Sequence, residues 1–142
     1  MIIHFIRHLW NRLFEVPDEP RSLIDVIAWW ELRRIAYNFI IGSVGAVSLV
    51  IFFISILSTG ILEPGEDAVE PMALIAAPIV INICYYAGSV AEIILRVLWP
   101  RKRSYFGPIL LKLGLAFSLL IVTFPALFWS GYRLLQICGV LK

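Results

Sequence analysis

The sequence predicts an all-α integral membrane protein, in which three transmembrane helices follow an N-terminal cytoplasmic amphipathic helix. Of the 142 residues, 61% are hydrophobic and 15% are charged, whereas a soluble domain has about 45–50% and about 25%. The apolar residues gather in three runs, each near the length of about 20 residues that crosses the hydrocarbon core of a bilayer. The polar residues within the second run recur at helical spacing, which indicates a helix with one polar face.

The charges between the runs predict the topology. Basic residues gather before the first run and in the loop 100–108, whereas the loop 59–71 is acidic. By the positive-inside rule the N-terminus and the basic loop lie in the cytoplasm, and the acidic loop and the C-terminus lie outside. The expected location is a multi-pass position in a cell membrane, taken to be a bacterial inner membrane. Three basic residues beside a span are more typical of a topology anchor than of a nucleic-acid site, so no nucleic-acid partner is expected.

Residues 1–34 form the predicted cytoplasmic and interfacial region. Residues 1–14 place apolar and basic side chains on opposite sides of a helix, a pattern typical of a helix in the headgroup layer or in a groove of a neighbouring subunit. A proline-containing linker follows at 16–20. Ser22, with Asp25 three residues later, then resembles a capping box and predicts the start of a long helix.

Aromatic rings and cations near the ends of the spans are expected to lie at the depth of the lipid headgroups. The predicted interface anchors are Trp29, Trp30, Arg33, Arg34, Trp99, Arg101, Lys102 and Arg103. An alternative interpretation of Trp29, Trp30, Arg33 and Arg34 is a binding site for an anionic cytosolic ligand.

The first span, 35–58, has a face of small and polar residues. Small side chains allow two helices to approach closely within lipid, so we expect this face to pack on the second span. The predicted packing residues are Asn38, Gly42, Gly45, Ala46 and Ser48.

The second span, 72–99, carries the polar face on which the prediction of function depends. Its members are separated by steps of three, four, three and four residues, and they are Asn82, Tyr85, Ser89, Glu92 and Arg96. Polar side chains find no hydrogen-bond partners among acyl chains, so we expect this stripe to face other helices or water. The order of Glu92 and Arg96 favours a local ion pair. The third span covers 109–133, and residues 134–142 form an outer tail.

The sequence offers little for catalysis or for a cofactor. It lacks a Gly-rich phosphate loop, an HExxH motif and a Cys/His cluster. His4 and His8 stand one helical turn apart, but two histidines on the wet face of a helix are a better interpretation than a metal site. We therefore expect no enzyme, no metal and no cofactor.

Two functions remain. The first is a homo-oligomeric ion channel or membrane-depolarising effector, in which several copies bring the polar face of the second span to a common pore. Asn82 and Ser89 would line this pore, Glu92 would favour cations, and a cytosolic or membrane partner would regulate it. The alternative is a non-conducting structural or accessory subunit of a larger membrane complex, in which the same stripe holds helices together.

Overall fold

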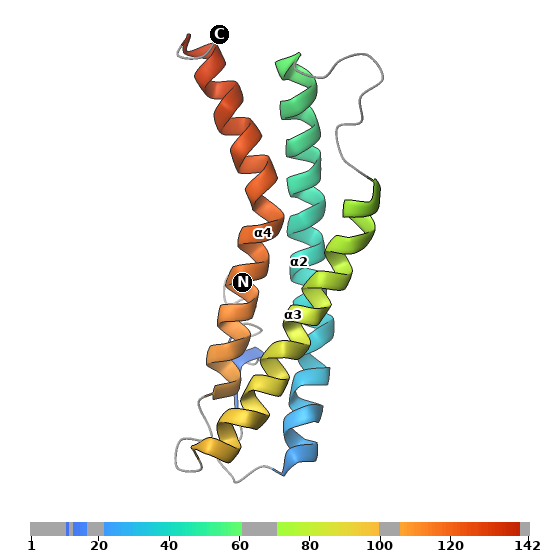
Figure 1. Cartoon of the computed structure of the whole chain (residues 1–142), viewed down its shortest axis with the longest axis vertical. Coiled ribbons are helices and arrows are strands. Elements are labelled where there is room, and N and C mark those ends of the chain that lie inside the picture. Colours follow the sequence, from blue (N-terminus) through green and yellow to red (C-terminus); the bar gives the residue numbers. More distant parts are fainter. Residues whose placement is uncertain (1–10, 12, 17–21, 61–70, 100–105, 140–142) are drawn as a thin grey trace, which may run out of the picture.

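The computed structural model describes residues 11, 13–16, 22–60, 71–99 and 106–139, and most of these residues lie in three long helices. They are α2 (Leu23–Thr59), α3 (Pro71–Leu98) and α4 (Phe106–Ile137). The chain runs up, down and up through them (Figure 1), and no strand occurs in the described part. All three helices are long and apolar enough to cross a membrane.

The start and end of α2 follow from local chemistry. The Ser22 side chain accepts a hydrogen bond from the Asp25 backbone N–H, and the Asp25 side chain accepts one from the Ser22 N–H. This is the capping box that the sequence predicts, and it satisfies two backbone donors at the helix start. Gly60 ends the helix in the left-handed region at φ 67°, a conformation that glycine adopts without a steric penalty.

The other two helices each contain a proline. Pro78 lies within α3 and Pro125 within α4. The helix α4 continues four residues past the predicted span, to Ile137, because residues 134–137 include no proline or glycine.

The two ends of the bundle differ. The end where α2 begins, α3 finishes and α4 begins is called the basal end here, and the opposite end the distal end. The end of α3 lies near the start of α4 at the basal end, and towards the distal end α3 and α4 diverge to opposite sides of α2 (Figure 1). Of the three helix pairs, α2 and α4 pack most extensively and α2 and α3 least.

This arrangement corrects one expectation. The small face of the first span was predicted to pack on the second span, but part of it packs on α4. The Ser48 hydroxyl donates to the Val122 carbonyl on α4 at 2.5 Å, and a Cβ added to Gly45 would lie 3.8 Å from Val122. Spacing along a helix identifies a packing face, but it does not identify which neighbour covers that face.

The main hydrophobic core lies in the basal half of the bundle. Its buried aromatic residues come from α2 and α3, and α4 adds Leu111 and Leu115. The full buried set is Val26, Trp29, Trp30, Tyr37, Ile41, Ile81, Tyr85, Leu111 and Leu115. A smaller cluster of Phe52, Ile56 and Ala126 joins α2 to α4 nearer the distal end.

Residues 13–16, which we call the N-terminal segment, fold back against this core. The Arg33 Nε donates to the Leu13 carbonyl at 2.5 Å, and both Arg33 Nη2 and Trp29 Nε1 donate to the Glu15 carbonyl at 2.9 Å. Lys112 Nζ of α4 lies 5.0 Å from the centre of the Phe14 ring. The segment thus contacts α2 and α4 of its own chain. The rest of the predicted amphipathic helix, including His4 and His8, lies outside the described residues.

Candidate functional site

The centre of the candidate site is a carboxylate that is buried where the three helices meet. Glu92 of α3 is 0% exposed. Its Oε1 accepts hydrogen bonds from Arg96 Nε at 2.8 Å and from Arg96 Nη2 at 2.5 Å, and its Oε2 accepts one from Trp30 Nε1 of α2 at 2.6 Å. The local ion pair that the spacing predicts is therefore present, and the indole N–H connects it to a second helix. We call Glu92, Arg96 and Trp30 the basal network.

The third helix closes this network from the other side. A Cβ added to Gly107, the second residue of α4, would lie 2.6 Å from Glu92 Oε2. The carboxylate therefore rests against the first turn of α4, where the unpaired backbone N–H groups and the helix dipole favour a negative charge. Only a residue without a side chain fits at this position, which gives Gly107 a structural role.

Buried aromatic residues surround the basal network. The Tyr85 hydroxyl donates to the backbone carbonyl of Trp30, and the two rings meet edge to face at 5.1 Å between centroids. Tyr37 lies 4.7 Å from Tyr85 by ring centroids, and its hydroxyl is 2.7 Å from the Ser118 hydroxyl of α4. Tyr37 and Ser118 are each 1% exposed, so these polar atoms depend on partners inside the bundle.

A second polar pair lies further towards the distal end. Asn38 Nδ2 of α2 donates to Asn82 Oδ1 of α3 at 3.2 Å, and Asn82 Nδ2 donates to the Pro78 carbonyl at 2.9 Å. Both side chains are half-buried. We call Asn38 and Asn82 the amide pair. It borders a cavity of about 790 Å³ between α2, α3 and α4.

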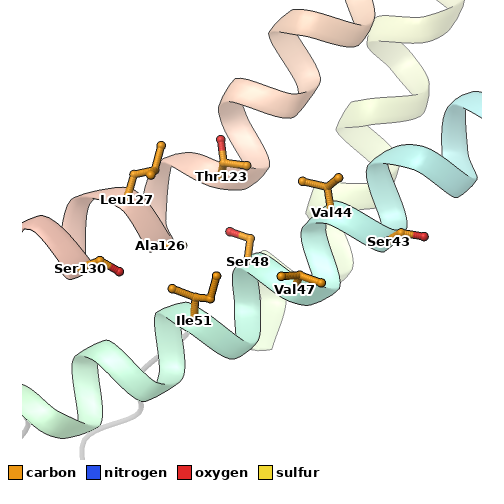
Figure 2. A pocket seen from close by; sticks show the side chains of 9 residues that line it. All are labelled: Ser43, Val44, Val47, Ser48, Ile51, Thr123, Ala126, Leu127 and Ser130. Atoms are coloured by element: carbon orange, nitrogen blue, oxygen red, sulfur yellow. The ribbon is translucent and has the colours of Figure 1, made fainter. Parts of the chain in front are cut away.

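The α2–α4 seam carries hydroxyl groups instead. Figure 2 shows a cavity of about 360 Å³ between these two helices, with Ser48 and Thr123 among its lining residues. The Thr123 hydroxyl donates to the Leu119 carbonyl of its own helix at 2.7 Å. The Ser130 hydroxyl lies 3.0 Å from that of Ser55. These hydroxyl groups therefore have partners within the bundle.

The predicted polar stripe of α3 thus divides into two groups. Tyr85, Glu92 and Arg96 are buried, at 2%, 0% and 7% exposure. Asn82 and Ser89 remain half-buried, and the Ser89 hydroxyl donates to the Tyr86 carbonyl of its own helix at 2.9 Å. Most of the stripe therefore faces protein within a single chain.

The predicted interface anchors also divide. Trp29 and Trp30 are 5% and 2% exposed, so both rings pack inside the bundle instead of facing outward. Arg33 lies over the Trp29 ring at 4.0 Å. Arg34 pairs with Glu31 at 3.2 Å on the surface, and Trp99 is 56% exposed. Arg101, Lys102 and Arg103 lie outside the described residues.

The remaining packing residues of α2 surround the larger cavity. Gly42 and Ala46 line it together with Gly45, and a Cβ added to Gly42 would meet no atom within 4 Å. These small residues leave space beside α3 where close helix contact was expected.

The basal network can hold helices together, but it does not resemble a catalytic site. Its carboxylate is fully buried and bonded to one guanidinium and one indole, so it has no access to a reacting group. Among the described residues, no three His, Cys, Asp or Glu side chains are grouped as metal ligands would be.

The sequence analysis named Trp30 as an interface anchor and not as a partner of Glu92, and it did not name Tyr37 or Gly107 as site residues. For Trp30 and Tyr37 a signal exists, because most of the buried residues of α2 recur at combined steps of three and four residues. This series is Val26, Trp30, Tyr37, Ile41, Ser48, Phe52 and Ser55, and Trp29 and Ile56 lie next to it. For Gly107 no pattern in the sequence reveals that Glu92 lies against it. Comparisons with protein-family models, with curated proteins and with solved structures gave no match.

Proposed function

We propose that this chain is a non-conducting structural or accessory subunit of a larger membrane complex. The observation that carries the proposal is the complete burial of Glu92 within one copy of the chain. An acidic residue that selects cations must face the water in a pore. Glu92 instead contacts Arg96 and Trp30, and Tyr85 beside it is also buried. The polar stripe therefore supports a role in holding the bundle together.

An accessory role also suits the outer surface of the bundle. Large apolar side chains project outward along α2, including Ile24, Ile35 and Phe39 at 77%, 76% and 75% exposure. Within a membrane such a surface contacts lipid or the helices of another protein. Because the basal network fixes the three helices against each other, the chain would present a preformed surface to its partner. In the proposed orientation the basal end lies at the cytoplasmic side.

The ion-conducting homo-oligomer is the second candidate. It is favoured by the half-exposed state of Asn82 and Ser89, which leaves two polar residues of the stripe available to a neighbouring copy. Such a pore would have to form without Glu92, and its selectivity for cations would then need another source.

Ion flux in liposomes separates the two candidates. We expect the purified chain to give no flux above protein-free vesicles. Flux that Asn82→Leu or Ser89→Leu abolishes, while the variant chain still folds and inserts, would overturn the proposal. The matched control is Ser43→Leu, which changes a polar residue of α2 outside the stripe.

The mass of the particle in mild detergent gives a second measurement. We expect a single chain when the protein is produced alone, and a larger particle with a partner at fixed stoichiometry when it is extracted from its source membrane. A particle of several identical copies that also conducts ions would support the channel instead.

A further inference from the structure

The amide pair has hydrogen-bonding capacity that the bundle does not use. Each side-chain amide carries two N–H groups, and each uses one of them, towards Asn82 Oδ1 and the Pro78 carbonyl respectively. No other hydrogen bond between described residues engages the second N–H of either amide or the Asn38 Oδ1. Acyl chains offer these groups no partner, and an unpaired polar group in hydrocarbon is unfavourable.

The amide pair lies at one end of an elongated apolar cavity. The cavity lining on α2 runs from Asn38 to Phe52, which spans about 21 Å of helix. On α3 it runs from Leu74 to Asn82. Because α3 runs opposite to α2, both asparagines are the lining residues nearest the basal end. They are also the only polar side chains in a lining made of described residues.

The lining of the cavity restricts the charge of an occupant. Among the described residues, no charged side chain lines the cavity, and its two polar residues are neutral amides. A charged group placed there would find no counterion in apolar surroundings, which is strongly unfavourable. A neutral polar group with an apolar tail suits this lining.

The cavity in the α2–α4 seam provides a contrast within the same molecule. Three of its four hydroxyl groups, on Ser48, Thr123 and Ser130, have partners in the bundle. The fourth, on Ser43, points away from the other labelled side chains in Figure 2. That cavity holds about 360 Å³, less than half the volume of the larger one. The unused amide N–H groups of Asn38 and Asn82 therefore lie at the larger of the two cavities.

From these observations we propose that the larger cavity binds a neutral, lipid-soluble molecule with a hydrogen-bond-accepting carbonyl group and an apolar tail. The carbonyl oxygen accepts the unused N–H groups of Asn38 and Asn82, and the tail extends along α2 towards the distal end. A volume of about 790 Å³ lies within the range of about 300–1,000 Å³ of small-molecule sites. This proposal does not depend on a partner subunit or on the accessory role.

The test uses the full chain in mild detergent, with a decyl-substituted benzoquinone as the probe and decylbenzene as the control that lacks carbonyl groups. Native mass spectrometry counts bound molecules and chain copies together, and a titration gives the affinity. We expect one quinone per chain and at least tenfold weaker binding of decylbenzene. Asn38→Leu and Asn82→Leu should each weaken quinone binding by about tenfold, the effect of losing one well-formed hydrogen bond.

A matched pair of neighbouring residues tests the cavity itself. Gly42→Leu fills the larger cavity without an initial clash, so it should abolish binding. Ser43→Leu adds the same side chain at the smaller cavity and should leave binding unchanged. Because Gly42→Leu keeps both amides, it remains informative even where the asparagine variants do not fold.

Three results would overturn the proposal. Equal binding of quinone and decylbenzene would identify an acyl-chain groove with no polar recognition. Quinone binding that neither asparagine variant weakens would remove the amide pair from the site. A particle of two chains that Gly42→Leu separates, with no quinone bound, would show that a second copy occupies the cavity.

Discussion

Replacing Glu92 and Arg96, singly and together, tests how the basal network stabilises the fold. Glu92→Leu removes the carboxylate that pairs with the Arg96 guanidinium, which is 7% exposed, and Arg96→Met removes two hydrogen bonds from the fully buried Glu92. Breaking a buried ion pair by removing one partner costs about 3–5 kcal/mol. If the two losses were independent, the double variant would therefore lose about 6–10 kcal/mol.

We expect a much smaller loss from the double variant. Replacing both partners removes both buried charges, and the Trp30 indole N–H then lacks its acceptor, at about 1–3 kcal/mol. The coupling free energy should therefore exceed about 3 kcal/mol. Unfolding by SDS in mixed micelles, followed by tryptophan fluorescence, measures the stability of the unchanged chain, the two single variants and the double variant. The fluorescence signal is comparable among them because Trp30 stays in every variant.

The surface pair Glu31–Arg34 provides the control. Its side chains are 41% and 39% exposed, and a solvent-exposed pair of this kind contributes about 0–1 kcal/mol. The same cycle with Glu31→Leu and Arg34→Met should give a coupling below about 1 kcal/mol. Additive losses at Glu92 and Arg96, with no larger coupling than at the surface pair, would refute the role given to the basal network.

Three further changes address other contacts. Gly107→Ala should destabilise the chain by about 1–3 kcal/mol, because its Cβ would press on Glu92 Oε2. Gly114→Ala of the same helix, with open space around it, should be neutral or slightly stabilising in the same unfolding assay, and equal effects would contradict the packing argument. Tyr37→Phe should cost about 1–3 kcal/mol by leaving Ser118 unpaired, and adding Ser118→Ala should recover part of the loss; no recovery would contradict the hydroxyl pair. Arg33→Met should accelerate backbone amide hydrogen exchange in the N-terminal segment by at least tenfold, since the Leu13 carbonyl loses the Arg33 donor and the Glu15 carbonyl loses one of its two donors; unchanged exchange would show that Arg33 does not hold this segment.

The sequence was sufficient to predict the three apolar helices, because length and composition alone identify segments that can cross a bilayer. It also predicted the capping box at Ser22 and the Glu92–Arg96 pair. All of these are local features, in which interacting residues lie within about one turn of each other. Periodicity reports such relations directly.

The partners of the polar stripe could not be predicted in the same way. A helical period fixes which side chains share a face, but the neighbour opposite that face depends on how three helices pack. Trp30 illustrates the difficulty, because a tryptophan near the end of a span suits both the headgroup layer and a buried position. Its contact with Glu92 joins residues 62 positions apart, and no local pattern encodes that pairing.

Mutations in the basal network and in the amide pair should therefore have different effects. At the basal end the charge of Glu92 is compensated by Arg96, Trp30 and the first turn of α4, and both carboxylate oxygens accept hydrogen bonds. Around the amide pair no helix begins, and unused N–H groups remain beside an open cavity. Polar groups that are fully bonded stabilise the fold, whereas those that are incompletely bonded can bind something else. Glu92→Leu should accordingly reduce the stability of the chain, while Asn82→Leu should largely preserve stability and reduce only ligand binding.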